Sequence, residues 1–131
     1  MRKREDWRRQ ARDAAFAYPR LRRELAELRR MSVTPRLGGS GRGGGDRRGT
    51  EDVALRQLAP GDQAALEAVE KALRMLRALR TADKRRRLAE LVYFRRTHTI
   101  LGAGVALGVS EETARQWDRD FLWAVYGAMS R

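Results

Sequence analysis

The chain has 131 residues, of which 42% are apolar and 35% charged, and its formal net charge is +12. That length allows one small domain with an extension, and the positive charge favours a polyanionic partner, with nucleic acid as the first candidate. The absence of cysteine excludes disulfides, thiolate metal sites and cysteine nucleophiles, and no apolar run is long enough to cross a bilayer. The basic N-terminus is not followed by the apolar segment of a secretory signal, so we expect a cytoplasmic protein.

The N-terminal segment has a heptad-like pattern, because apolar residues recur at steps of four and three from Trp7 to Leu28. Pro19 disfavours helix at the preceding residue, so we expect two helices, residues 4–17 and 19–31, although one kinked helix is the alternative. The seam can pack on the rest of the chain or on a second copy. We favour a homodimer, because the domain that follows is small, with these oligomerisation residues: Trp7, Tyr18, Leu21, Leu25 and Leu28.

Charge is concentrated in the first part of the chain. Residues 1–50 contain 15 basic and 6 acidic side chains, against 14 and 11 in residues 51–131. The N-terminal arm can therefore contact DNA phosphates, although the arginines can equally solvate a long helix.

The middle of the chain is predicted to contain a linker followed by two helices. Residues 31–49 contain seven glycines, which predicts a flexible linker at residues 32–49. A short helix is expected at residues 51–58, capped by Thr50. A longer amphipathic helix is expected from Asp62 to Arg80, buried along Leu66, Val69, Leu73 and Leu76.

Thr81 is expected to cap the next helix, in which Leu88, Leu91, Val92 and Phe94 face inward. Four consecutive cations, Lys84 to Arg87, lie near its start, and two more, Arg95 and Arg96, follow its end. Because such a supporting helix commonly abuts the DNA backbone, we expect phosphate contacts from Lys84, Arg85, Arg86, Arg87, Arg95, Arg96 and Thr97, the alternative being a solvated face. His98 is the only histidine and has no second histidine or cysteine with which to share a metal, so we interpret it as a loop or cap residue.

The stretch from Thr99 to Val125 predicts a helix-turn-helix. Small and apolar residues fill two helical turns, and Gly108 can take the positive φ that ends the first helix. Glycines within residues 102–108 allow that helix to pack closely on its neighbour. Ser110 is a good N-cap for the second helix.

In the second helix, Ala114, Trp117, Phe121 and Val125 form a buried stripe, which leaves a polar face free. That face carries Glu111, Glu112, Thr113, Arg115, Gln116, Asp118 and Arg119. Arginine suits guanine, glutamine suits adenine, and glutamate suits the amino group of cytosine. We therefore expect bases to be read by Glu112, Arg115, Gln116 and Arg119, with phosphate contacts from Ser110 and Thr113. The alternative is an ordinary surface helix.

The sequence V-S-E-E-T-A-R-Q-W-D resembles the recognition helix of sigma-factor region 4. This resemblance implies that Glu112, Arg115 and Gln116 face bases. The chain departs from the family at Glu111 and Thr113, where basic residues are usual, so the resemblance does not carry over the phosphate contacts that those two basic residues would make. A longer resemblance, carried by YPRLRRELAELRRMSVTP, TEDVALRQL, AVEKAL, LVYF and VSEETARQW in that order, is to the RinA-type and ArpU-type late transcription activators of phages and prophages of Gram-positive bacteria.

The resemblance implies a sequence-specific activator that binds double-stranded DNA and works with host RNA polymerase in the bacterial cytoplasm. An alternative is a phage terminase small subunit, which an assembly of eight or more subunits would favour. A third alternative is a protein-binding module such as an anti-sigma factor.

The predicted fold is all-α: an N-terminal helical arm (1–31), a Gly-rich linker (32–49) and a C-terminal helical bundle with a helix-turn-helix (50–131). Carboxylates sit amid arginines on predicted helix surfaces, and no nucleophile motif occurs. We therefore expect no enzyme activity, cofactor, metal, membrane contact or small-molecule substrate.

Overall fold

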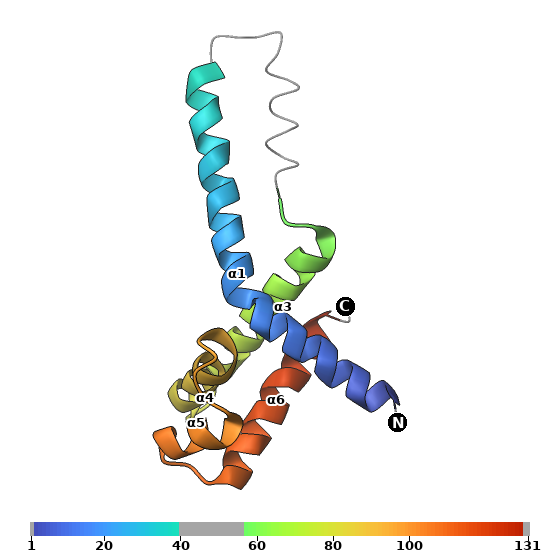
Figure 1. Cartoon of the computed structure of the whole chain (residues 1–131), viewed down its shortest axis with the longest axis vertical. Helices are drawn as coiled ribbons and strands as arrows, with labels where there is room; N and C mark the ends of the chain where they lie inside the picture. Colours follow the sequence, from blue (N-terminus) through green and yellow to red (C-terminus); the bar gives the residue numbers. More distant parts are fainter. Residues whose placement is uncertain (1, 40–56, 130–131) are drawn as a thin grey trace.

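The computed structural model describes residues 2–39 and 57–129, and in these ranges every regular element is a helix. The all-α class predicted from the sequence is therefore confirmed. The elements in chain order are α1 (Arg2–Gly39), α3 (Pro60–Leu76), α4 (Ala82–Ala89), the π-helical turn η1 (Glu90–Phe94), α5 (Ile100–Leu107) and α6 (Glu111–Met129). Figure 1 shows the N-terminal part of α1 crossing α3 and α6, while α4 and α5 lie together at the lower end beside the start of α6.

Helix α1 is one continuous element of 38 residues, so the preferred prediction of two helices, 4–17 and 19–31, is wrong. Figure 1 shows the helix changing direction partway along, as expected where Pro19 lacks an N–H and its ring crowds the carbonyl one turn earlier. Ala15 and Leu21, on either side of Pro19, are both fully buried and hold the two halves on the same core. The helix continues to Gly39, past the boundary predicted at residue 31, and the rest of the predicted linker, residues 40–49, lies outside the described residues.

The apolar seam of α1 packs on the C-terminal helices of the same chain. Tyr18 and Leu21 are buried in a core shared with α3, η1 and α6. The centroids of the Tyr18 and Phe94 rings lie 5.0 Å apart. The prediction that Tyr18 and Leu21 meet a second copy is corrected, because these side chains leave almost no surface for a partner. The other predicted oligomerisation residues are partly buried against the same core: Trp7, Leu25 and Leu28.

Helix α3 starts at Pro60 and ends at Leu76, earlier at both ends than the predicted range of 62–80. Pro60 suits the first turn, where its missing N–H is not needed and its φ is already helical. The predicted seam is confirmed, since Leu66, Val69 and Leu76 are buried and Leu73 packs on the core. Of the short helix predicted at 51–58, residues 57 and 58 are not helical and the others lie outside the described residues.

The helix predicted after Thr81 forms as α4 and η1. Leu88 is buried as predicted, and Leu91, Val92 and Phe94 are partly buried. In η1 the N–H of Arg95 donates to the carbonyl of Glu90 at 2.7 Å, a bond that spans five residues instead of four. The wider turn changes the direction in which the following side chains point, and Tyr93 is only 2% exposed.

Candidate nucleic-acid interface

Helix α5 has a defined cap at each end. Thr99 Oγ1 accepts a hydrogen bond at 3.0 Å from the backbone N–H three residues later. At the other end, Gly108 has a φ of 74°, and the N–H groups of Gly108 and Val109 donate to the carbonyls of Val105 (3.1 Å) and Gly104 (2.9 Å). This pair of bonds is a Schellman motif, which satisfies carbonyls that the end of a helix leaves unpaired. The first helix therefore ends where the sequence predicted.

The glycine inside α5 allows the close contact with α6. A Cβ built on Gly104 would lie 3.0 Å from the Cβ of Ala114 and 3.5 Å from the carbonyl oxygen of Val109. Since carbon atoms in contact normally stay about 3.5–4.0 Å apart, only a residue without a side chain fits there without moving the helices. The close packing predicted for the glycine-rich first helix is confirmed at Gly104.

Three residues, 108–110, separate α5 from α6, which is the length typical of a helix-turn-helix. Ser110 caps α6, because its Oγ accepts from the N–H of Thr113 at 3.1 Å. The predicted stripe is buried: Ala114, Trp117, Phe121 and Val125. Trp117 and Ala114 form a second small core with Leu88 and Ala103, which joins α4, α5 and α6 into one unit.

The residues predicted to read bases lie on the exposed face of α6. Glu112, Arg115, Gln116 and Arg119 are all exposed. The Arg115 guanidinium is paired with the Glu111 carboxylate one turn earlier, with an Nη2–Oε2 distance of 2.7 Å. Because both side chains are at least half exposed, this pair contributes little stability, and the guanidinium can exchange it for another acceptor.

Asp118 is not on that exposed face, which corrects one prediction. Only 7% of Asp118 is exposed, and its Oδ1 accepts a short hydrogen bond from the Tyr93 hydroxyl of η1. Burial raises the pKa of the Asp118 carboxyl, while the hydrogen bond from Tyr93 and the positive charges of Arg12 and Arg8 oppose the rise. Burial, followed by the charge of Asp118, raises the pKa of the Tyr93 phenol, so that the hydroxyl remains a donor.

This buried pair was not predicted, because Asp118 shares the polarity of its exposed neighbours and Tyr93 lies in a helical turn of unusual register. The two arginines that act on Asp118 belong to α1, more than 100 residues earlier in the chain. The N-terminal helix therefore reaches the middle of α6, next to the predicted base-reading residues.

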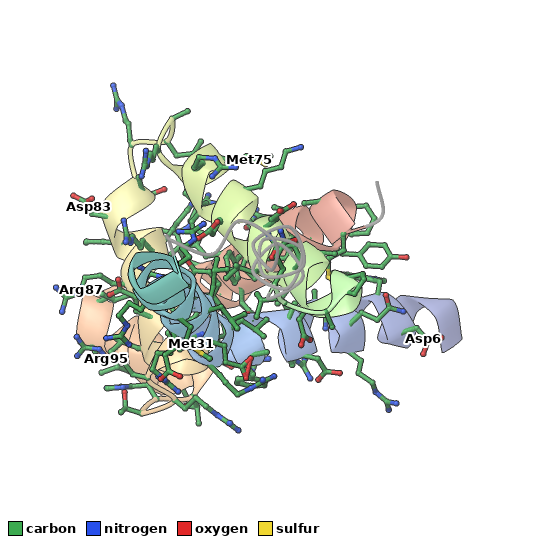
Figure 2. The ribbon with its side chains drawn as sticks, turned by 90° about the horizontal axis from the view of Figure 1, so that it is seen from above. Asp6, Met31, Met75, Asp83, Arg87 and Arg95 are labelled. Atoms are coloured by element: carbon green, nitrogen blue, oxygen red, sulfur yellow. The ribbon has the colours of Figure 1, made fainter. Side chains whose placement is uncertain are left out.

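The four cations that begin α4 do not share one role. Arg85 is tied to the protein: its Nε donates to Thr81 Oγ1 at 2.9 Å, its guanidinium carbon lies 5.4 Å from the Trp117 ring centre, and its Nη1 lies 3.4 Å from Asp120. Arg86 pairs with Glu90 at 3.4 Å. Lys84 and Arg87 are exposed, and Figure 2 shows Arg87 pointing outward. Of the four predicted phosphate contacts, Lys84 and Arg87 are thus the best placed, and Arg85 mainly positions α4 on α6.

The three residues after η1 that were predicted to contact phosphate are exposed, and the contacts themselves remain a prediction: Arg95, Arg96 and Thr97. Figure 2 shows Arg95 at the same edge of the molecule as Arg87. Arg96 has a φ of 57°, and its guanidinium carbon lies 4.5 Å from the centre of the Phe16 ring of α1. Thr97 Oγ1 lies 2.8 Å from Nδ1 of His98, which is exposed in the loop before α5.

The two hydroxyls predicted to contact phosphate at the start of α6 bond to each other. Ser110 Oγ donates to Thr113 Oγ1 at 2.9 Å while it accepts the capping bond. Both lie on the protein surface at the turn, Ser110 exposed and Thr113 partly so. The capping role was predicted, and their phosphate contacts remain a prediction.

Within residues 2–39 and 57–129, no group of three or more His, Asp or Glu is placed to hold a metal ion. None of the helices described is long and apolar enough to span a membrane. The chemistry that gathers around α6 is instead that of exposed guanidinium, amide and carboxylate groups on a rigid helical unit.

Comparison with known proteins adds no relative: no protein-family model, curated protein or solved structure matches the chain. The resemblance to sigma region 4 and to the phage late activators therefore remains an expectation based on short stretches of sequence.

Proposed function

We propose that this chain is a sequence-specific double-stranded DNA-binding regulator of transcription, in which α6 enters the major groove. The observation that carries the proposal is the α5–turn–α6 unit, with a Schellman turn at Gly108, an N-cap at Ser110 and an exposed face on the first turns of α6. The major groove admits one α-helix, and the N-terminal turns of a recognition helix are the part that reaches base edges.

The residues of that face fit the proposed role. Arg115 and Arg119 can donate to guanine, Gln116 can bond adenine on two atoms, and Glu112 can accept from cytosine. They lie on a helix whose opposite face is fixed by Ala114 and Trp117, so the reading side chains start from a rigid backbone. The net charge of +12 supplies the attraction to phosphate that both sequence-specific and non-specific DNA binding require.

A narrower proposal, supported by the resemblance alone, is that the regulator is a phage or prophage late-gene activator that works with host RNA polymerase. Recruitment would place the chain beside or at the position that a sigma region 4 occupies. This narrower proposal depends on the broader one, because recruitment requires binding at a defined DNA sequence.

The test begins with selection of bound sequences from random duplex DNA at physiological salt. On the selected site, Arg115→Ala should weaken binding by about 1–3 kcal/mol and should have little effect on random DNA, because a base contact carries sequence information. Lys84→Ala should weaken binding to all duplexes alike, because phosphates are the same in every sequence. The matched control is Arg23→Ala, which removes one exposed cation from α1 beyond Pro19.

Two results would refute the proposal. One is a selection that yields no preferred sequence. The other is an equal loss on selected and random DNA for Arg115→Ala, since α6 would then not be the reading helix.

A further inference from the structure

The N-terminal part of α1 brings a second set of cations to the proposed DNA-binding face. Arg8 and Arg12 are exposed, and both are close enough to act on the Asp118 carboxyl of α6. Arg8 also lies 5.6 Å from the ring centre of Trp7, whose ring packs edge-on against that of Trp123 of α6 at 5.0 Å. The Trp7–Trp123 contact packs this turn of α1 against α6, and Arg12 lies one helical turn after Arg8 on the same side of α1.

Arg96 is held against the same stretch of α1. Its guanidinium lies over Phe16, and the Phe16 ring is 5.1 Å from that of Tyr93, the hydrogen-bond partner of Asp118. Arg12 and Phe16 are one helical turn apart, so they lie on the same side of α1. We call the group of Arg8, Arg12 and Arg96 the arginine flank.

The arginine flank and α4 lie on opposite sides of the exposed face of α6. Successive residues of an α-helix are about 100° apart around its axis, so Asp118 and Asp120 point to opposite sides of the exposed Arg119. Asp118 faces Tyr93 and the arginines of α1, whereas Asp120 faces Arg85 of α4. The proposed reading face therefore lies between two positively charged walls, one from α1 and one from α4.

We propose that the arginine flank is a second phosphate-binding surface, which contacts the DNA strand across the major groove from the strand that α4 contacts. This inference rests on the proposed function, because it needs α6 to lie in the groove. The major groove is bounded by two phosphate strands, so a helix in it meets one on each side. Arginine suits this partner, since its guanidinium has five N–H donors and keeps some free when its face is stacked on a ring.

The proposal also explains the packing of α1 on the helix-turn-helix unit. Stacking of Arg96 on Phe16 and of Arg8 on Trp7 restricts these side chains before DNA arrives, so less of their rotamer freedom remains to be lost on binding. The N-terminal helix then has a role that its charge alone does not reveal: it places arginines beside the recognition helix.

The first experiment measures the dependence of binding on salt for the full chain and its selected duplex. The double variant R8Q/R12Q should reduce the slope of log K against log salt by about two units, because each lost phosphate contact removes about 0.9. The matched control R23Q/R29Q removes two exposed arginines from the same helix beyond Pro19 and should leave the slope within about half a unit. An unchanged slope for R8Q/R12Q would overturn the inference.

The second experiment identifies the strand by ethylation interference, in which modified phosphates that block binding are mapped. R8Q/R12Q should relieve interference at phosphates on one side of the site, and K84Q/R87Q at phosphates on the other. If both variants relieve the same phosphates, the two-wall arrangement is wrong. R96Q provides a second test if circular dichroism shows that R8Q/R12Q alters the fold, because R96Q leaves the groups around Asp118 in place. It should lower the slope of log K against log salt by about one unit.

The outcomes separate this inference from the proposed function. If the wild-type protein prefers a sequence but neither R8Q/R12Q nor R96Q changes the salt dependence of binding, the arginine flank is refuted. The proposed function then remains intact. Wild-type protein with no preferred duplex refutes both.

Discussion

The buried hydrogen bond between Tyr93 and Asp118 gives the sharpest test of how η1 and α6 are held together. Tyr93 is 2% exposed and Asp118 is 7% exposed, so water cannot replace a lost partner for either group. Tyr93→Phe keeps the ring and its contacts with Phe16 and Phe121, and removes only the hydroxyl that Asp118 needs.

The size of the effect follows from the charge on Asp118. A hydrogen bond to a charged group contributes about 1.5–3 kcal/mol, and one between neutral groups about 0.5–1.5 kcal/mol. Tyr93→Phe should therefore reduce the free energy of unfolding by about 2 kcal/mol in the wild-type background. In an Asp118→Asn background the same change should cost only about 1 kcal/mol, since the amide oxygen still accepts a hydrogen bond but carries no charge.

The pH dependence of the free energy of unfolding gives a second test of the Tyr93–Asp118 pair. Because burial raises the pKa of Asp118 above its ordinary 3.8, the native state binds this proton more tightly than the unfolded state. Its contribution to stability therefore falls as pH rises from 3.8 through the folded pKa and is constant above it. Asp118→Asn should abolish this component, and Tyr93→Phe should extend it to higher pH.

Urea unfolding followed by circular dichroism measures these changes, with a double-mutant cycle of Tyr93→Phe and Asp118→Asn. A loss below about 0.5 kcal/mol for Tyr93→Phe, or equal losses in both backgrounds, would show that Asp118 is solvated or neutral and would refute this reasoning.

The remaining predictions concern the turn and the α1 seam. Gly108→Ala should cost about 1 kcal/mol or more by urea unfolding, because its φ of 74° disfavours any side chain, whereas Gly61→Ala, with nothing within 4 Å, should stay within about 0.5 kcal/mol. Loss of DNA affinity without loss of stability in Gly108→Ala would contradict that explanation. Leu21→Ala should cost about 2–5 kcal/mol by unfolding and leave the mass measured by light scattering unchanged, because Leu21 packs within its own chain. A fall in the mass measured by light scattering, with unchanged stability, would instead support the hypothesis that Leu21 lies in a dimer interface.

Local patterns in the sequence determined the α5–turn–α6 unit. The ends of α5, the cap at Ser110 and the buried stripe of α6 all depend on residues within one or two helical turns of each other. Side-chain hydrogen bonds at caps, the freedom of glycine at positive φ and the 3.6-residue period are local properties, so they can be predicted without the rest of the chain. The same holds for the all-α class and for the exposure of Arg115 and Gln116.

The tertiary structure alone decided what the helices pack against. A heptad-like seam predicts contact without naming the partner, and the structure directs Tyr18 and Leu21 into their own chain. The π-helical turn placed Tyr93 in the core and gave Asp118 a buried donor, although a single aspartate among charged neighbours carries no local sign of burial. Arg8 and Arg12 lie beside α6 for the same reason, since contacts between residues more than 100 positions apart arise from packing of the whole chain.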